Sequence, residues 1–173
     1  MTNPLVLAPI FVPLGSAALS VLFSGQRRVQ RLIGISATTI AWLASLAVLY
    51  ANWTGGVQIY AIGGWQPPFG IVLAPDLLSA LLEVMATTVV LAGMIYALGC
   101  KDKCVQLPAF VPLFLCMSAG LNGAFYTGDI FTLFVFQELM VISSVILVGI
   151  SDNRLGVEAA IKYLLISSMG SLF

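Results

Sequence analysis

The chain contains no histidine, and only 8% of its 173 residues are charged. Without histidine it has neither a histidine metal ligand nor a histidine general base. A soluble domain carries about 25% charged residues, so this sequence has too little charge to form a polar shell. These shortages exclude an ordinary soluble domain and point to an integral membrane protein.

Basic clusters and cysteine-rich motifs are also missing. Seven Lys and Arg residues balance seven Asp and Glu residues, and the net charge of zero excludes a nucleic-acid partner. Cys100 and Cys104 supply at most half of a metal site, and Cys116 is isolated, so free thiols and no metal are expected. No redox ligand set or nucleotide motif is present, and no cofactor is predicted.

Apolar runs dominate the sequence, with 60% hydrophobic residues and a mean hydropathy of +1.07. A spanning helix needs about 20 apolar residues. Five such segments lie at 4–23, 32–51, 76–98, 108–126 and 129–150, and a sixth starts near Val157. The prediction is an all-α, polytopic transmembrane bundle with five full helices and the start of a sixth, in a single membrane domain over residues 1–173.

The two ends of the chain carry separate expectations. The N-terminus has no basic region and no small-residue cleavage site, so it is interpreted as a retained transmembrane helix and not a signal peptide. At the other end, Phe173 has no polar flank. We expect either the N-terminal portion of a longer subunit or an unusually short last helix.

Basic residues occupy alternate linkers. The linkers after the first, third and fifth segments contain Arg27, Arg28, Arg31, Lys101, Lys103 and Arg154, whereas 52–75 and 127–128 contain none. Cytoplasmic loops carry the excess of Lys and Arg. The sequence therefore predicts an external N-terminus and cytoplasmic basic linkers.

The linker 52–75 differs from the others. It combines the strand-forming run VQIYAI with two glycines and the pair Pro67-Pro68. We predict a short hairpin on the outer face, with Trp53, Tyr60 and Trp65 near the membrane interface.

Glu138 lies about nine residues into the segment 129–150, near the middle of a hydrocarbon core about 30 Å thick. Its neighbours on the same helix face are apolar: Phe134, Val135, Val141 and Ile142. An ionised acid there is costly, so we expect Glu138 to be protonated, paired with a base from another helix, or beside a water-filled path. Each state suits a proton carrier. The alternative is a structural acid that hydrogen-bonds a neighbouring helix.

Lys162 and Glu158 are spaced i,i+4 in the sixth segment, a favourable ion-pair spacing. Lys162 is either part of the proton pathway or a snorkelling lysine satisfied by Glu158. Helix geometry places it about 10 Å nearer the cytoplasm than Glu138, so a link through water is expected and not direct contact.

Glu83 lies at a depth similar to that of Glu138, in the segment 76–98. It belongs either to an outer half-channel or to a structural contact with a hydroxyl such as Thr87 at i+4.

Five further polar or helix-breaking residues are assigned structural roles. Asp76 and Asp129 open their segments as N-caps. Ser118 and Asn122, at i,i+4, can bond across helices. Pro112 is expected to interrupt its helix with a kink.

Three stretches together resemble the D-type membrane component of Mrp cation/proton antiporters. They are TGDIFTLFVFQELMVISSVILVG (127–149), GGWQPPFGIVLAPDLLSALL (63–82) and GVEAAIKYLLISSMGSLF (156–173). The superfamily includes the antiporter-like subunits of complex I and of membrane-bound hydrogenases. The resemblance implies that Glu138 is the fifth-helix glutamate of proton transfer and that Lys162 is a lysine found early in the sixth helix.

The sequence also departs from that family. Gln137 stands where an aromatic residue is usual, and Glu83 is outside the family pattern. Family members have about fourteen helices, so their seventh-helix lysine would lie beyond Phe173.

The function expected from this resemblance is proton/cation exchange, with Na⁺ as the expected cation, in a multi-subunit complex of a prokaryotic cell membrane. Its partners are other membrane subunits and the lipid bilayer, and the chain is a transporter subunit with no catalytic residue of its own. One alternative is a proton-pumping membrane-arm subunit of complex I or of an energy-converting hydrogenase. A second is a split or truncated structural subunit without transport.

Overall fold

The computed structural model describes residues 4–64, 70–151 and 153–172, which are almost entirely helical. Within these ranges the α-helices are α1 (Ala8–Leu22), α2 (Arg27–Gly55), α3 (Leu77–Gly99), α4 (Phe110–Tyr126), α5 (Ile130–Gly149) and α6 (Arg154–Leu172). A 3₁₀ turn, Pro4–Leu7, precedes α1, and a second one, Ile62–Gly64, follows the short strand β1 (Tyr60–Ala61), which pairs with β2 (Val72–Leu73).

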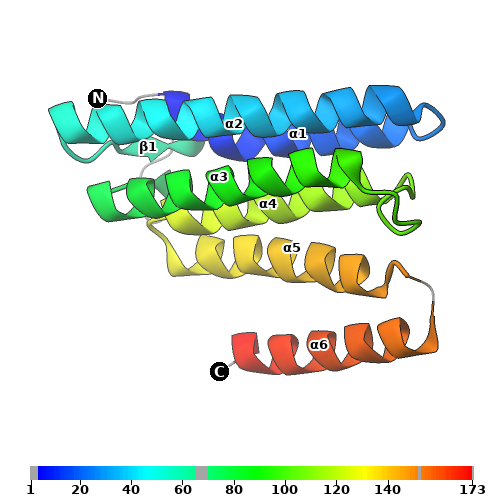
Figure 1. Ribbon diagram of the computed structural model, residues 1–173. Coiled ribbons are helices and arrows are strands. Elements are labelled where there is room, and N and C mark those ends of the chain that lie inside the picture. The colour runs from blue at the N-terminus through cyan, green and yellow to red at the C-terminus, as the bar shows by residue number, and fades with distance from the viewer. Residues whose placement is uncertain (1–3, 65–69, 152, 173) are drawn as a thin grey trace.

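The helices form a four-helix bundle extended on one side. Helices α1 to α4 pack against one another, α5 packs on α4, and α6 packs mainly on α5 (Figure 1). Helix α1 begins and helix α6 ends toward the same end of the bundle. Among the described helices, α6 thus lies at one edge of the array.

In the described part of the chain, four helices are long and apolar enough to cross a membrane: Pro4–Leu22, Arg27–Gly55, Leu77–Gly99 and Ile130–Gly149. Helix α4 is apolar but has 17 residues, because the helix starts at Phe110 and not at Pro108. Helix α6 starts at Arg154, three residues before the predicted start. The all-α transmembrane bundle is confirmed.

The predicted bounds of the second helix, 32–51, were too short at both ends. Helix α2 has 29 residues, so Arg27, Arg28 and Arg31 lie in its first turns and Trp53 in its last. Backbone groups entering a bilayer are best satisfied inside a helix, and arginine side chains reach water from helix ends. The helix stops at Gly56, whose φ of 75° favours glycine.

Two prolines, which have no backbone N–H, leave the carbonyl four residues earlier without its helical donor. In both cases the amide side chain of a buried residue supplies the hydrogen bond instead. Pro13 has no N–H for the Pro9 carbonyl one turn earlier, and Asn122 Nδ2 of α4 donates to that carbonyl at 2.6 Å. The prediction that Asn122 bonds across helices is therefore confirmed. This bond ties α4 to α1 inside the bundle.

Pro112 plays the same part at the opposite end of α4. Its missing N–H frees the Pro108 carbonyl, which accepts from Gln30 Nε2 at 3.0 Å, and Gln30 also donates to the Ser20 carbonyl at 2.9 Å. The expected kink at Pro112 was wrong, because α4 begins at Phe110 and proline is tolerated in a first turn.

Helices α4 and α5 approach at two glycines. A Cβ on Gly120 would lie 2.7 Å from the Met140 nitrogen and 2.8 Å from the Phe136 carbonyl oxygen. A Cβ on Gly123 would overlap the Phe136 ring. Small residues permit such close backbone packing in membrane helices, and here they set the position of α5.

The predicted hairpin between the second and third helices is present as β1 and β2, paired in the register Tyr60–Leu73 and Ala61–Val72. The Ala74 N–H donates to the Tyr126 carbonyl, and the Gly128 N–H donates to the Val72 carbonyl, both at 2.9 Å. The hairpin is thus attached to the α4–α5 turn. The predicted positions of Trp65 and of Pro67-Pro68 lie outside the described residues.

Candidate functional site

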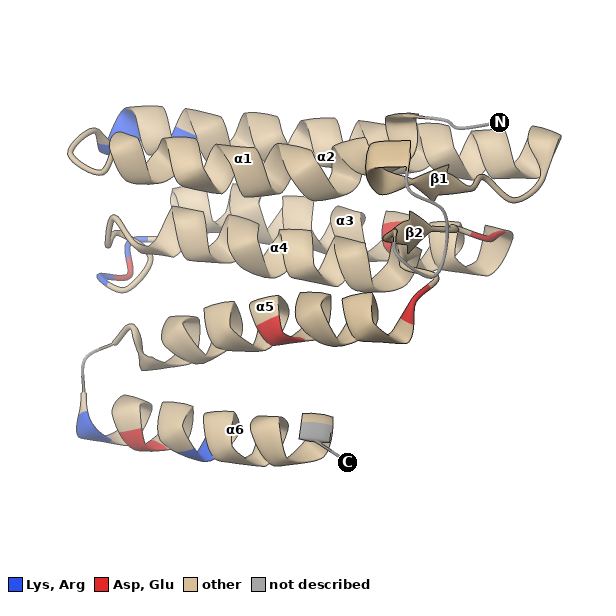
Figure 2. Ribbon diagram, turned by 180° about the vertical axis from the view of Figure 1, so that it is seen from behind, with Lys and Arg blue, Asp and Glu red and all other residues tan. Residues whose placement is uncertain are grey.

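Glu138 lies midway along α5, the red segment of that helix in Figure 2. Its side chain is half-buried, and Oε1 accepts a hydrogen bond from Ser171 Oγ of α6 at 2.8 Å. Ser171 Oγ also donates to the Ser168 carbonyl at 3.1 Å. The contact found for this carboxyl among the described residues is therefore a neutral hydroxyl and not a base.

Lys162 Nζ forms an ion pair with Glu158 Oε1 at 2.5 Å, as the i,i+4 spacing predicted. The Lys162 side chain is 68% exposed and that of Glu158 51%, so both lie on the outer side of α6. An exposed pair of this kind stabilises a helix only weakly.

The register of α5 on α6 separates Lys162 from Glu138. Ser144 Oγ shares a hydrogen bond with the Tyr163 hydroxyl at 3.1 Å, which places Lys162 near the level of Ser144. Ser144 is six residues from Glu138, or about 9 Å along the helix. The two charged side chains predicted for the pathway lie on neighbouring helices and are not brought into contact.

Glu83 is fully buried in α3, inside the four-helix bundle. Neither of its carboxyl oxygens has a hydrogen-bond partner among the described residues. An unpaired carboxylate away from water costs several kcal/mol, so this environment favours the neutral, protonated acid.

Tyr126, at the end of α4, lies close enough to Glu83 to interact with it electrostatically, and its buried hydroxyl also has no partner among the described residues. Thr87 does not bond the carboxyl. Its hydroxyl donates to the Glu83 backbone carbonyl at 2.8 Å and shares a hydrogen bond with Ser45 of α2 at 2.9 Å. The expected hydrogen bond between Thr87 and the Glu83 carboxyl is therefore wrong. A threonine hydroxyl readily bonds the backbone carbonyl one turn earlier in its own helix, and Thr87 does so here.

The two predicted caps are confirmed. Asp76 Oδ1 accepts from the Ser79 N–H at 2.7 Å, and Asp129 Oδ2 accepts from the Thr132 N–H at 2.9 Å and the Thr132 hydroxyl at 2.7 Å. These hydrogen bonds from Ser79 and Thr132 lower the pKa of each aspartate. Both aspartates are therefore anions placed at positive helix ends.

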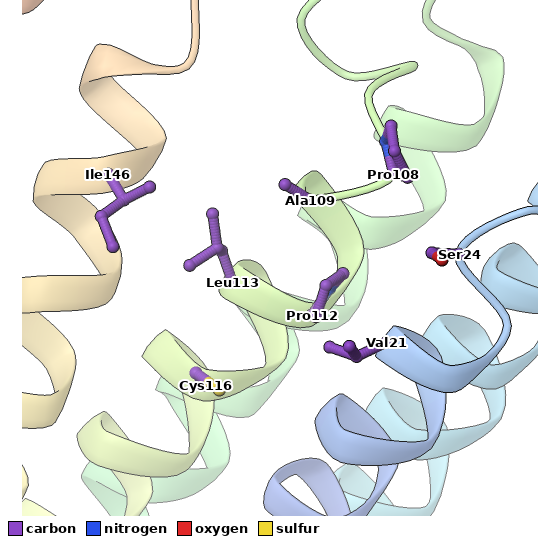
Figure 3. Close-up of a pocket in the computed structure, with 8 residues that line it drawn as sticks. All are labelled: Val21, Ser24, Pro108, Ala109, Pro112, Leu113, Cys116 and Ile146. Atoms are coloured by element: carbon purple, nitrogen blue, oxygen red, sulfur yellow. The ribbon is translucent and has the colours of Figure 1, made fainter.

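A groove of about 540 Å³ lies between α1, α4 and α5, and neither Glu83 nor Glu138 lines it. Figure 3 shows Leu113 of α4 and Ile146 of α5 on one side, and Val21 and Ser24 on the other. Its lining has no charged residue, so the groove offers nothing that would bind an ion. Among the described helices, the acidic side chains are Glu138, Glu83 and the glutamate of the α6 ion pair.

Sequence reasoning missed two members of these sites, Ser171 and Tyr126. Ser171 lies 33 residues from Glu138, and nothing in its neighbourhood marks it out. Tyr126 ends an apolar helix and carries no sequence signal that connects it with Glu83. In both cases the helix packing brings the residue near the acid.

The apolar helices of the fold define a multi-pass membrane protein, and two carboxyl groups, those of Glu83 and Glu138, lie within these helices. No protein-family model matches the chain. Its sequence is 32% identical to the D-type component of the Na⁺/H⁺ antiporter of Alkalihalophilus pseudofirmus, over 98% of this chain and 34% of that protein. It is 35% identical to the corresponding component of a probable K⁺/H⁺ antiporter of Rhizobium meliloti, over 96% and 32%.

Two solved structures share the fold. The Mrp complex of a Dietzia species matches 99% of this chain and 33% of its own, with a TM-score of 0.87 and 25% identity. An archaeal membrane-bound sulfane sulfur reductase, a respiratory complex, matches 98% and 35%, with a TM-score of 0.84 and 26% identity.

The resemblance to the D-type component of Mrp antiporters is thereby confirmed. The chain spans about one third of the length of the curated relatives that it matches.

Proposed function

We propose that this chain forms part of a membrane subunit that exchanges protons for a cation within a multi-subunit complex of a prokaryotic cell membrane. The observation that carries the proposal is Glu138, a carboxyl midway along α5 whose contact is a hydroxyl of the next helix, in a chain that matches D-type antiporter components over nearly its whole length. A carboxyl held by a neutral donor can take up and release a proton as nearby charge changes.

In this proposal, Glu138 holds the transferred proton and the Lys162–Glu158 pair supplies the nearby charge. The pair is on the helix that contacts Glu138, about 9 Å away along the axis. A lysine charge at that separation alters the proton affinity of a carboxyl most strongly where little water lies between the two groups. Separation of Lys162 from Glu158 would then favour release of the proton from Glu138.

Glu83 is proposed as a second proton-binding group, in the bundle of α1 to α4. Its burial and unpaired oxygens favour the protonated state, and Tyr126 is the titratable neighbour identified beside it. Because Glu83 lies inside the bundle of α1 to α4 and Glu138 at the α5–α6 contact, Glu83 would act in a separate part of the pathway.

Na⁺ remains the expected cation, and K⁺ is the competing one, because the relatives include components of a Na⁺/H⁺ and of a probable K⁺/H⁺ antiporter. A second candidate function is proton pumping in a respiratory complex, which the sulfane sulfur reductase match favours. The two functions differ in what drives the protons. An antiporter moves protons when a cation is added without any redox substrate, and a respiratory pump does not.

The test uses everted membrane vesicles containing the assembled complex. Addition of Na⁺ or K⁺ should collapse a preformed pH gradient. The Glu138→Gln variant should assemble normally and lower this exchange by about a hundredfold, the scale of a lost proton-transferring side chain. Glu138→Asp should retain part of the activity.

Asp102→Asn is the matched control, because it removes an exposed acid from the α3–α4 linker and should exchange at the wild-type rate. Wild-type exchange by an assembled Glu138→Gln complex would show that the acid is structural and would refute the proposal.

A further inference from the structure

Four residues on one face of α2 change from basic to apolar over two turns. Arg28, Arg31, Leu32 and Ile35 are spaced i, i+3, i+4 and i+7, so they lie on the same side of the helix. Together with Leu98, near the end of α3, they line a groove of about 390 Å³. The groove has a charged mouth at the end of the bundle and an apolar floor.

The two guanidinium groups at this mouth have no assigned partner. Within the described parts of the chain, neither Arg28 nor Arg31 forms an ion pair or a side-chain hydrogen bond. Most blue segments of Figure 2 gather at this end of the bundle, where Lys101 and Lys103 add more positive charge than Asp102 between them offsets. The mouth therefore has a surplus of positive charge that an anion would neutralise.

The apolar floor lies at the right depth for a lipid chain. Ile35 is seven residues below Arg28, or about 10 Å along the axis. Leu32 is 68% exposed, although it lies in a helix long and apolar enough to span the membrane. A surface that is basic at the helix end and apolar about 10 Å deeper matches the headgroup and acyl region of one lipid molecule.

We propose that this groove binds an anionic phospholipid, with its phosphate between Arg28 and Arg31 and an acyl chain along Leu32, Ile35 and Leu98. Guanidinium groups bind phosphate oxygens through paired hydrogen bonds. Basic pockets between transmembrane helices are suited to such headgroups. The site is independent of the proton chemistry at Glu138.

Arg27 is a matched control for this site. It is one residue away on α2 but does not line the groove. It lines the neighbouring small pocket with Gln30, Gln106 and Val111, and Arg31 lies between the two and lines both. Removing its charge alters the net charge of this end of the bundle as much as removing that of Arg28, and leaves the groove intact.

The test is native mass spectrometry of the purified complex, containing the full subunit, from nanodiscs of phosphatidylglycerol and phosphatidylcholine. The Arg28→Gln/Arg31→Gln variant should retain about one phosphatidylglycerol molecule per chain fewer than the wild type, because one groove binds one lipid. Arg27→Gln should retain the wild-type number. Equal retention by the wild type and the double variant, or equal loss in Arg27→Gln, would overturn the proposal.

A second measurement keeps both arginines and so does not depend on the stability of the double variant. A photo-reactive amino acid in place of Ile35 should cross-link to phospholipid on illumination of the complex in native membranes. Cross-linking only to a neighbouring subunit would show that protein covers the groove and would refute lipid binding.

Discussion

Single polar side chains inside the bundle compensate for defects in the backbone. Asn122 and Gln30 each donate to a carbonyl that lies four residues before a proline, and so reach backbone groups that a regular helix would satisfy itself. A buried carbonyl without a donor is costly, and the cost is larger where no water is present. At the residue scale, stability therefore depends on a few amides.

This compensation can be tested with a double-mutant cycle on Asn122 and Pro13. Asn122→Ala should lower the free energy of unfolding by about 1–3 kcal/mol, because the Pro9 carbonyl loses its donor. In a Pro13→Ala background a helical N–H can serve that carbonyl, and the same change should cost less. Unfolding of the purified protein in detergent measures both values, and the cavity left by the amide is common to the two backgrounds.

An equal cost of Asn122→Ala in the two backgrounds would show that Asn122 does not serve the carbonyl exposed by Pro13.

At the scale of helices, the contact between α4 and α5 determines where Glu138 lies. Gly120 faces the backbone of Phe136 and Met140, the residues that bracket Glu138. Backbone atoms cannot turn away as a side chain can. The spacing of the two helices is therefore set by the absence of a side chain at Gly120.

Gly120→Ala should force α4 and α5 apart. The added Cβ would lie 2.7 Å from the Met140 nitrogen, and overpacking of this kind costs about 1–3 kcal/mol. We expect a lower thermal unfolding temperature and lower proton-coupled exchange, although the Glu138 carboxyl is retained.

Gly15→Ala is the control for this change, because its Cβ would meet no atom within 4 Å and alanine favours helix. If Gly120→Ala were as stable and active as Gly15→Ala, the close approach of the two backbones would not be a constraint.

At the scale of the whole molecule, charge is distributed along the bundle axis. The basic residues of the α1–α2, α3–α4 and α5–α6 connections gather at one end, and the hairpin lies at the other (Figure 2). Positively charged connections are retained in the cytoplasm. The orientation expected is an external hairpin and N-terminus.

Cysteine labelling tests this orientation in a background with Cys100, Cys104 and Cys116 changed to Ser. A membrane-impermeant maleimide added to intact cells should label Val57→Cys, at the hairpin end, and should label Gln26→Cys only after the membrane is opened. The reverse pattern would place the N-terminus in the cytoplasm and overturn the prediction.

Sequence alone determined the class of protein, the six helical segments of the described residues, the place of Glu138 midway along its helix, the caps and the Lys162–Glu158 pair. Each depends on composition or on residues within a few positions of one another, so local physical chemistry is sufficient. The ends of the helices were predicted less accurately, as α2 shows, because polar and aromatic residues at the membrane interface extend a helix beyond its apolar core.

Only the tertiary structure decided which buried groups meet. Asn122 and Pro9 are 113 residues apart, Gln30 and Pro108 are 78 apart, and Glu138 meets Ser171 across 33 residues. The electrostatic proximity of Glu83 and Tyr126 and the groove lined by Arg28 and Leu98 arise in the same way. Such contacts follow from how helices pack, and packing depends on the shapes of all the facing side chains, which no local pattern encodes.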